Sequence, residues 1–584
     1  MARSLVRVVL ALALLVATWL GGAPPRTIAA APVPIALRLL GTYVSGLGEG
    51  AAETVAYDRG RIFITNAASN TLDLVDVTDP AAPRLVRRID LAPFGAGPNS
   101  VAAHEGIVAV AVEAAPKTAP GSVVVFDRDG ALLDDVRVGA LPDMLTFTPD
   151  GRYLLVANEG EPNSYNQPDS VDPEGTVSII DVRPLLATRR PERPERPERP
   201  ERPDRPDRPG TTTATATPGA GATATPTASP TASPTAAPRG AARPDAVRTV
   251  DFRDFNAGGR RRAELSPDVR VFGPNATVAQ DLEPEYIAVS ADSRTAYVVL
   301  QENNAFAVVD VGSGRIERLL PLGFKDHSVA GAGLDASDQD AQVNIRPWPV
   351  KGMYQPDAVA AYQAGGATYL VTANEGDARD YPGFSEEARA GSLELDPAAF
   401  PNAAELRQSR NPGRLNVTRT LGQGPSGYTG LYAFGARSLS IWRAETGARV
   451  WDSGDQLERI TAQTFPGAFN ASNSNNTFDN RSDDKGPEPE AVAVGDVGGR
   501  AYAFIGLERI GGVATFDVTD PREPALVHYV NNRDFTRTPP GPDSGAEIVR
   551  FVPAAASTTG RPLVLVSNEI SGTVSVYEAG PAGA

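Results

Sequence analysis

The chain has 584 residues, with 71 acidic and 55 basic side chains and three histidines, so its formal net charge is −16. Such a surface repels nucleic acid and anionic lipid and favours cations. There is no cysteine, which excludes disulfides, lipid-modified cysteines and cysteine nucleophiles. A chain of this length is too long for one compact core, but it suits a repeat architecture whose units pack against their neighbours.

Residues 1–31 are typical of a secretory signal. Arg3 and Arg7 form a positive start, residues 8–20 are an apolar run too short to span a bilayer, and alanines at 29–31 offer a cleavage site. We therefore expect a protein that is exported, either secreted or held at the cell surface, with no membrane span after signal cleavage. A retained membrane anchor is the alternative.

Seven times along the chain, an acidic or amide residue opens an apolar strand, and a second apolar strand follows that ends in a carboxylate or amide. The opening residues are Glu53, Asn99, Asp143, Glu285, Asp357, Glu490 and Glu547. The second strands end at Asn66, Glu113, Glu159, Glu302, Glu375, Glu508 and Glu569. A third strand follows in every unit and a fourth in most, which predicts an all-β fold: a seven-bladed β-propeller of the WD40/YVTN-like type.

The two ends of the chain complement each other. The seventh unit ends after its third strand at 573–579, whereas the strand at 35–43 precedes the first unit without a partner. Pairing the early strand with the last blade would close the ring and remove two unpaired sheet edges. We therefore expect residues 32–584 to form a single seven-bladed propeller domain.

One stretch does not belong to the repeats. Residues 190–209 repeat Pro-Glu-Arg or Pro-Asp-Arg triplets, and residues 210–238 are almost entirely Thr, Ala, Pro, Ser and Gly. Such compositions form an extended rod and a flexible tether, which could carry O-linked sugars. Because the stretch falls between two strands of the third unit, we expect a disordered insertion at 188–243 rather than a domain boundary.

Two further insertions have a more varied composition. One covers 376–436 and contains a predicted short helix at 386–390, and the other covers 458–489. Long loops within compact domains are often functional, so these segments are candidates for the walls of a binding site.

Several strings carry a resemblance to a known family. They are LVANEGEPN (155–163), QDLEPEYIAVSAD (280–292), LVTANEGDARDY (370–381) and DDKGPEPEAVAVG (483–495). They resemble the choice-of-anchor I family, a group of bacterial exported propellers similar to the mesenchyme-specific cell-surface glycoproteins. The resemblance implies an extracellular propeller, and it covers residues 36–187 and 245–579. Some relatives are labelled alkaline phosphatases or esterase-like proteins, but the family supplies no agreed catalytic residues.

The repeated acids predict a metal site. The first strand of a propeller blade lines the central channel and the second runs antiparallel beside it, so the start of one and the end of the other share a face. The candidate ligands are Asp143, Glu159, Glu161, Glu285, Glu302, Asp357, Glu375, Asp377, Asp380, Glu490 and Glu508. Oxygen ligands with almost no histidine favour Ca²⁺ or Mg²⁺ over zinc.

Crowded carboxylates need compensation. At a separation of ~6 Å and an effective dielectric constant near 20, each like-charged pair costs roughly 3 kcal/mol, so protons, cations or basic side chains must intervene. The basic or titratable loop residues expected on the same face, and hence the candidate ligand-binding residues, are Lys325, His327, Lys351, Arg379, Lys485 and Arg509. The alternative role for the repeated acids is structural, because a carboxylate at a strand start often accepts backbone N–H bonds.

No standard enzyme motif is present in the sequence, and catalytic residues are not identified. The favoured hypothesis is a monomeric extracellular scaffold whose acidic channel mouth binds cations and holds a ligand, a polymer or a surface protein. The alternative is a calcium-dependent phosphoesterase of the alkaline-phosphatase-like type, in which Lys325, Lys351 or Arg379 would contact the phosphoryl oxygens.

Overall fold

The computed structural model describes residues 33–184, 247–537 and 541–582. The predicted signal at 1–31 and the predicted insertion at 188–243 lie outside the described residues. The described residues form seven four-stranded sheets, one five-stranded sheet and two two-stranded sheets. The predicted all-β class is confirmed.

The first four sheets each use consecutive strands. The first contains β2 (Val55–Asp58), β3 (Arg61–Asn66), β4 (Thr71–Asp76) and β5 (Arg84–Asp90). The second contains β6 (Gly97–His104), β7 (Ile107–Glu113), β8 (Pro120–Asp127) and β9 (Leu132–Ala140). The third contains β10 (Pro142–Phe147), β11 (Tyr153–Asn158), β12 (Thr176–Asp181) and β13 (Val247–Asp251). The fourth contains β14 (Ile287–Val289), β15 (Thr295–Leu300), β16 (Ala305–Asp310) and β17 (Arg315–Pro321).

The remaining three sheets complete the set. The fifth contains β20 (Val359–Ala364), β21 (Ala367–Asn374), β29 (Ser438–Arg443) and β30 (Ala448–Asp452). The sixth contains β31 (Pro489–Val497), β32 (Arg500–Leu507), β33 (Val513–Asp517) and β34 (Ala525–Val530). The seventh contains β35 (Ala546–Val552), β36 (Leu563–Asn568), β37 (Thr573–Pro581) and the N-terminal strand β1 (Ile35–Val44), which pairs antiparallel with β37.

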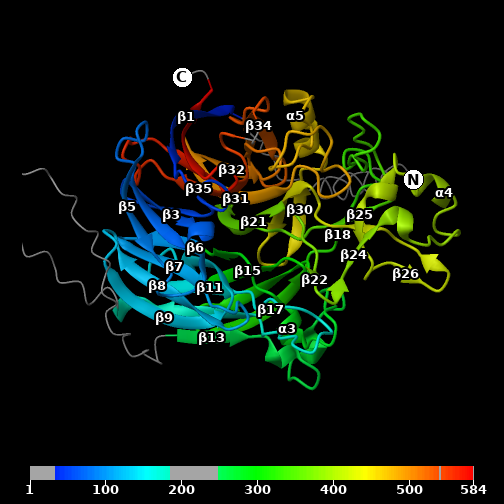
Figure 1. The fold of residues 1–584 in the computed structure, drawn as a ribbon, viewed down its shortest axis with the longest axis horizontal. Coiled ribbons are helices and arrows are strands. Elements are labelled where there is room, and N and C mark those ends of the chain that lie inside the picture. Colours follow the sequence, from blue (N-terminus) through cyan, green and yellow to red (C-terminus); the bar gives the residue numbers. More distant parts are fainter. Residues whose placement is uncertain (1–32, 185–246, 538–540, 583–584) are drawn as a thin grey trace, which may run out of the picture.

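The first strand of each four-stranded sheet contacts the first strand of the next. The contacting pairs are β2 and β6, β6 and β10, β10 and β14, β14 and β20, β20 and β31, β31 and β35, and finally β35 and β2. Apolar side chains fill the space between successive sheets, as where Val55 and Ile64 pack with Val574 of the seventh sheet. Figure 1 shows the sheets following one another around the molecule in chain order, so that the red C-terminal sheet lies beside the blue N-terminal one.

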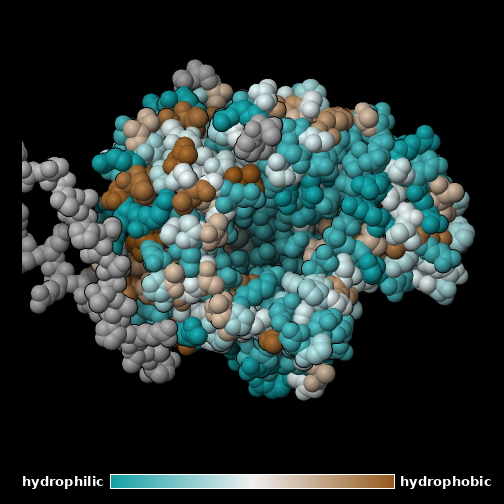
Figure 2. Space-filling model, viewed as in Figure 1, coloured by the Kyte–Doolittle hydropathy of each residue, from teal (hydrophilic) through white to brown (hydrophobic). Residues whose placement is uncertain are grey.

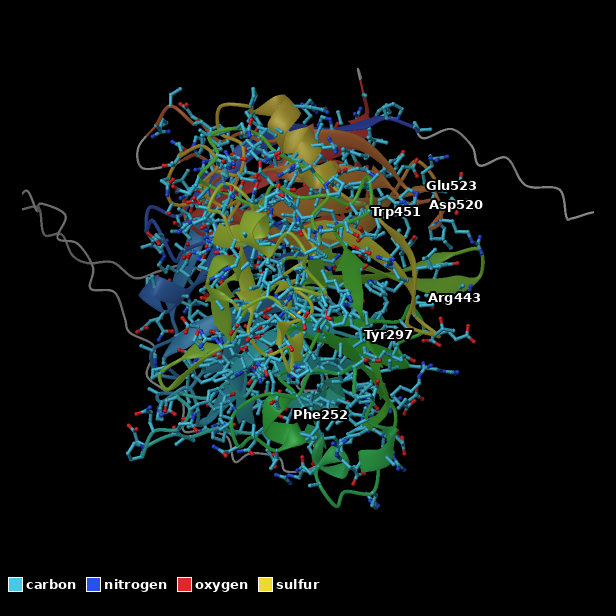
Figure 3. All side chains as sticks on the ribbon, turned by 90° about the vertical axis from the view of Figure 1, so that its right-hand side faces the viewer. Phe252, Tyr297, Arg443, Trp451, Asp520 and Glu523 are labelled. Atoms are coloured by element: carbon cyan, nitrogen blue, oxygen red, sulfur yellow. The ribbon has the colours of Figure 1, made fainter. Side chains whose placement is uncertain are left out.

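The strand directions define two faces. Tyr297 lies near the start of β15, Arg443 ends β29, and Asp520 follows β33, and Figure 3 shows all three along one side of the molecule. Because these strand ends adjoin the ends of the first strands, we call this side the end face. The opposite side carries the beginnings of the first strands, and we call it the start face. Figures 1 and 2 view the start face.

The predicted helix at 386–390 is wrong. Residues Glu387–Arg389 form strand β24, which pairs with β25 (Asn416–Thr418). The side chain of Glu386 is fully buried, where it accepts hydrogen bonds from Arg270 at 2.5 Å and from the backbone of Arg379 at 3.1 Å. These tertiary contacts override the local helix propensity.

The strand β24 belongs to a five-stranded sheet built by the insertions beside the fifth sheet. Its other members are β18 (Phe324–Asp326), β19 (Lys351–Met353), β28 (Tyr432–Ala433) and β25. The two small hairpins pair β22 (Asp380–Tyr381) with β23 (Phe384–Ser385) and β26 (Gln423–Gly424) with β27 (Gly427–Tyr428). The α-helices are short: α3 (Val278–Asp281), α4 (Ala403–Leu406) and α5 (Gln456–Thr464). Within the described ranges, none of the helices has the length and apolar character needed to cross a membrane.

The pairing of β1 with β37 makes the stability of the seventh sheet depend on the N-terminal strand. Leu37 is 5% exposed and packs in the core between the sixth and seventh sheets, whereas Leu39 on the same strand is 41% exposed. We expect Leu37→Ala to lower the free energy of unfolding by about 2–4 kcal/mol, because it removes buried methyl groups and leaves a cavity. Urea denaturation measures this change. The control Leu39→Ala should change it by less than about 0.5 kcal/mol, and equal losses would contradict the role assigned to β1.

Candidate functional site

Each opening acidic or amide residue lies in an irregular start of a first strand. Asn99, Asp143, Glu490 and Glu547 fall in register shifts of β6, β10, β31 and β35. In the other three sheets the opening residue is Glu53, Glu285 or Asp357. Its N–H donates to the carbonyl of one residue of the second strand, and the N–H of that same residue donates to the carbonyl of the residue after the acid, at 2.8–3.2 Å. In all seven sheets, therefore, an extra residue enters the first strand. Such a β-bulge turns a side chain out of the strand's regular alternation, which re-aims the opening side chain at the start face.

The Asn-Glu pairs at the ends of second strands divide into two roles. Asn158 is fully buried, and its amide donates to the hydroxyls of Thr176 at 3.1 Å and Ser178 at 3.0 Å. Asn374 donates in the same way to Ser438 and Ser440. The asparagine thus ties the second strand to the third, while the glutamate that follows it continues onto the start face.

Carboxylates from different sheets lie close enough to raise one another's pKa. Burial is the largest cause and, together with the charges of Glu569 and Asp143, raises the pKa of Glu53 to about 8. Burial also raises the pKa of Asp143, Glu302 and Glu375 to about 7 in each case. We call this set the acidic rim, which contains Glu53, Asp143, Glu159, Glu161, Glu283, Glu285, Glu302, Asp357, Glu375, Asp377, Glu488, Glu490, Glu508, Glu547 and Glu569.

Figure 2 shows a hollow near the centre of the start face, with hydrophilic residues around it. Within the acidic rim, three groups of carboxylates have ligand oxygens within 4.8 Å of one another. They are Glu159 with Glu283 and Glu302, Asp357 with Glu375 and Glu490, and Glu375 with Glu488 and Glu508. The electrostatic surroundings of the three groups differ, and this difference decides which of them has negative charge left for a cation.

The group around Glu488 is already neutralised by protein cations. Glu488 forms ion pairs with Lys485 at 3.1 Å, Arg509 at 2.9 Å and Arg481 at 2.7 Å. Burial opposes the ionisation of Glu488, but these three cations hold its pKa well below the ordinary value. The ammonium of Lys485 also bonds Glu375, and Arg509 pairs with Glu508 at 2.9 Å. This group is an ion-pair network that fixes the rim, and little charge is left for a metal.

In the group of Glu159, Glu283 and Glu302, the negative charge is only partly compensated by a protein cation. The guanidinium of Arg379 is fully buried and pairs with Asp281 at 2.8 Å and with one oxygen of Glu283 at 2.9 Å. The other oxygen of Glu283 is buried without a hydrogen-bond partner. Burial raises the pKa of Glu283 well above its ordinary value. One cation therefore serves several carboxylates at this point of the rim.

The group of Asp357, Glu375 and Glu490 also has only one member with a cationic partner. Only Glu375 has a cationic partner, Lys485. Burial raises the pKa of Asp357 and of Glu490 well above their ordinary values, and the nearby charge of Asp357 raises that of Glu490 further. Glu490 is 7% exposed, and one of its oxygens has no partner. A divalent cation could satisfy these oxygens.

The remaining predicted metal ligands divide between the rim and the surface. Glu161 accepts from Lys117 and from the hydroxyl of Tyr381 at 2.5 Å, so it lies within the rim but is engaged. Asp377 is accessible to solvent, yet desolvation raises its pKa, with Lys485 opposing the shift. Asp380 is exposed on the hairpin of β22 and β23 and belongs to none of the three close groups.

The predicted basic residues also separate. Arg379, Lys485 and Arg509 lie in the acidic rim, whereas the interactions of Lys325, His327 and Lys351 lie in the five-stranded sheet and its surroundings. Lys325 is buried and donates to the carbonyls of Ala436 and Gly454 at 2.8 and 2.7 Å. The second cluster forms because β18 and β19 pair with each other, away from the first strands.

His327 and Lys351 therefore do not share a site with the rim. His327 is buried, and its Nδ1 lies 2.7 Å from the carbonyl of Ala332. Burial lowers the pKa of His327 well below its ordinary value. Lys351 is exposed and lies 5.4 Å from the centre of the Tyr432 ring. The predicted ligand-binding residues therefore do not form one cluster, since the contacts of Lys325, His327 and Lys351 lie in the five-stranded sheet and its surroundings.

Two acids of the rim were not predicted from the sequence. Glu283 and Glu488 each stand two positions before an opening acid, in the repeated Glu-Pro-Glu strings at 283–285 and 488–490. The repetition of this string in two units was the signal that could have revealed them. Each places a second carboxylate beside the first across a proline.

The fold and site define an all-β protein of repeated four-stranded sheets with a buried carboxylate rim. A family model described as the choice-of-anchor I domain matches residues 53–190 and 231–521. The chain therefore belongs to the choice-of-anchor I family.

Two relatives are similar over part of the chain. The mesenchyme-specific cell surface glycoprotein of Strongylocentrotus purpuratus is 31% identical over 316 residues, which cover 47% of this chain and 40% of that protein. Gigasin-3a of Magallana gigas is 30% identical over 182 residues, which cover 28% of this chain and 63% of that protein. The chain thus spans less than two thirds of the length of both relatives.

Two solved structures are also similar. Hydrazine synthase of Kuenenia stuttgartiensis has a TM-score of 0.40 at 12% identity and covers 95% of this chain and 99% of that chain. The β-propeller domain of Cps50 (Swd1) of Myceliophteria thermophila has a TM-score of 0.38 at 9% identity and covers 93% and 99%.

The raised carboxyl pKa values predict a pH dependence of stability. Between the ordinary carboxyl value of 4.5 and the values of about 7 to 8 at Glu302, Glu375 and Glu53, the folded state binds more protons than the unfolded chain. In the presence of EDTA, the free energy of unfolding should therefore fall as the pH rises through this window. Denaturation in urea between about pH 6 and 9 measures the slope. Glu302→Gln should flatten it, and a slope of the opposite sign would contradict the assignment.

The ion-pair network predicts a large cost for removing its central cation. Lys485→Met should lower the free energy of unfolding by about 3–5 kcal/mol, because Glu375 and Glu488 would lose a buried partner. Lys351→Met is the matched control on an exposed lysine and should cost no more than about 1 kcal/mol. Thermal and urea unfolding compare the two variants. Similar small losses in both would contradict the network.

Proposed function

We propose that the chain is an extracellular binding scaffold: a closed seven-bladed β-propeller whose acidic channel mouth on the start face binds Ca²⁺. The single observation that carries the proposal is the group of Asp357, Glu375 and Glu490. Its ligand oxygens lie within 4.8 Å of one another, and two of its carboxylates have no cationic partner.

The cyclic order of strand contacts supports the closed ring. The first strand of the seventh sheet contacts that of the first sheet, and β1 pairs with β37 next to this junction. A ring of this kind brings the start of every first strand to one opening. That convergence explains why carboxylates far apart in the sequence, such as Glu53 and Glu547, affect each other's pKa.

The chemistry of the rim supports a hard cation. Each like-charged carboxylate pair at about 5 Å costs roughly 3 kcal/mol at an effective dielectric constant of 20. Protons relieve this repulsion at low pH, and a divalent cation would do so at higher pH. Oxygen ligands without histidine suit Ca²⁺, or Mg²⁺ as the second choice. The bound cation would then present open coordination positions to an anionic group of a ligand, a polymer or a surface protein.

The family and its relatives support a location outside the cell. The name of the Strongylocentrotus purpuratus relative places that protein at the cell surface. The charged and apolar pattern of residues 1–31 and the absence of cysteine agree with export. The phosphoesterase alternative gains no support, because Lys325 and Arg379 are engaged in internal bonds rather than available to a phosphoryl group.

Calcium binding tests the proposal directly. Isothermal titration of the metal-free protein with Ca²⁺ at about pH 8 should show binding. Thermal unfolding should show a higher melting temperature with Ca²⁺ than without it, because the cation binds the folded state. Glu490→Gln should weaken Ca²⁺ binding at least about tenfold, since it removes an uncompensated carboxylate ligand.

The matched control is Asp380→Asn, which changes an acid outside the rim and should leave Ca²⁺ affinity unchanged. Mg²⁺ titrated in the same way tests the second choice of ion. Absence of heat and of a melting shift with either ion would overturn the cation site. Equal weakening by both variants would show non-specific attraction to the net negative charge.

A further inference from the structure

A second site lies on the end face, at the other opening of the space between the first strands. A cavity of about 240 Å³ is bordered by Tyr57, His104, Phe147 and Phe551. These residues stand at the ends of β2, β6, β10 and β35, whereas the rim acids stand at the beginnings of first strands. A neighbouring cavity of about 260 Å³ shares Thr146, Phe147, Pro149, Arg550 and Phe551 with the first and continues to Tyr286.

The walls of this space combine polar and apolar surface in about equal parts, and several of the lining side chains are held in place by contacts. The rings of Phe551 and Phe504 stack with centres 5.7 Å apart, and His104 lies against Phe147 at 5.5 Å. The hydroxyl of Tyr57 donates to the carbonyl of Ala556 at 3.0 Å, so its ring faces the space as an apolar surface. The cavity is therefore preformed.

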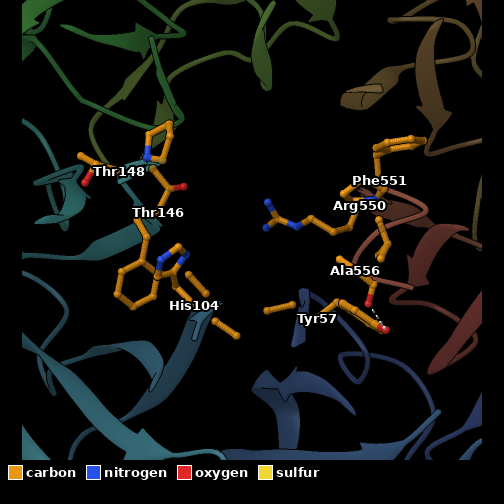
Figure 4. A pocket seen from close by; sticks show the side chains of 14 residues that line it. Tyr57, His104, Thr146, Thr148, Arg550, Phe551 and Ala556 are labelled. Carbon is orange, nitrogen blue, oxygen red and sulfur yellow. Dashed lines mark hydrogen bonds between the residues drawn. The ribbon is translucent and has the colours of Figure 1, made fainter. Parts of the chain in front are cut away.

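One charged group projects into this space. Figure 4 shows the side chain of Arg550 extending from β35 into the open region, with Thr146 and His104 on the opposite side. Within the described residues, Arg550 forms no ion pair, and its buried Nε has no hydrogen-bond partner. This distinguishes it from the buried Arg379, whose donors are all directed at acids or carbonyls.

We propose that this cavity binds the carboxylate of a small apolar or aromatic molecule, with the Arg550 guanidinium as its anchor. The planar guanidinium matches a carboxylate through two parallel hydrogen bonds. The hydroxyl of Thr146 and the imidazole of His104 offer further polar contacts on the facing wall, and the phenylalanine rings pack against the apolar body.

The balance of charge favours a carboxylate over a phosphate. A single guanidinium neutralises a monoanion, whereas a phosphate dianion beside it would retain an uncompensated charge. The cavity size suits a molecule of one ring rather than a polymer. The residues of this site stand at the ends of first strands, whereas the rim acids stand at their beginnings, so the two proposed sites lie at opposite openings.

Benzoate is a direct probe of this site, and its uncharged relative benzamide is the matched ligand control. Saturation-transfer NMR and isothermal titration of the full chain, with EDTA present, should show benzoate binding and no comparable benzamide binding. Arg550→Gln should weaken benzoate binding at least about tenfold, because it removes the charge-assisted pair of bonds. Arg522→Gln, on an exposed arginine outside both cavities, should have no effect.

Arg550→Lys provides a second test in case Arg550→Gln does not fold. It keeps the charge but loses the planar fork, and benzoate should bind it more weakly than the parent chain. Benzoate binding that is absent from the parent chain, or unchanged in both Arg550 variants, would overturn the proposal. Inorganic phosphate binding more tightly than benzoate would overturn the carboxylate assignment. Loss of calcium binding in Glu490→Gln with benzoate binding retained would show that the two sites are separate.

Discussion

The structure depends on how the negative charge that its four-stranded sheets bring together is compensated. Every four-stranded sheet begins its first strand with an acidic or amide residue in a β-bulge, and the contacts between first strands bring these starts to one face. Burial and mutual repulsion then raise the pKa of most of these acids. The loops around the rim are therefore organised by buried cations, of which Lys485 and Arg379 each serve more than one carboxylate.

Protein cations compensate the negative charge of the acidic rim unevenly, so its carboxylates differ in their capacity to bind a further cation. Around Glu488, three cations meet one carboxylate, which leaves a rigid network. Asp357 and Glu490 form no ion pair among the described residues, and burial raises the pKa of both. The same face therefore contains structural ion pairs and oxygens with unused capacity. At the other end of the first strands the pattern reverses, since Arg550 is a cation without an ion pair among the described residues.

Sequence patterns predicted the strands well because they depend on local alternation and turn residues. The strand starts, the Asn-Glu strand ends and the pairing of β1 with the last sheet all follow from these signals. The insertions were harder to predict. The helix expected at 386–390 is strand β24, since the buried contacts of Glu386 outweigh helix propensity. Lys325 and His327 were grouped with the rim because loop direction was assumed, but the pairing of β18 with β19 carries them elsewhere.

The sequence by itself determined the all-β class, the recurring strand unit and the residue types at the strand starts, because alternation and bulge positions are local properties of the chain. Only the tertiary structure decided which carboxylates lie close together, which of them form ion pairs with cations and which have no cationic partner. That outcome depends on distances between side chains from different sheets and insertions, such as Glu375 with Lys485. Electrostatic energy varies with these distances and with burial, and neither is encoded in the spacing of residues along the chain.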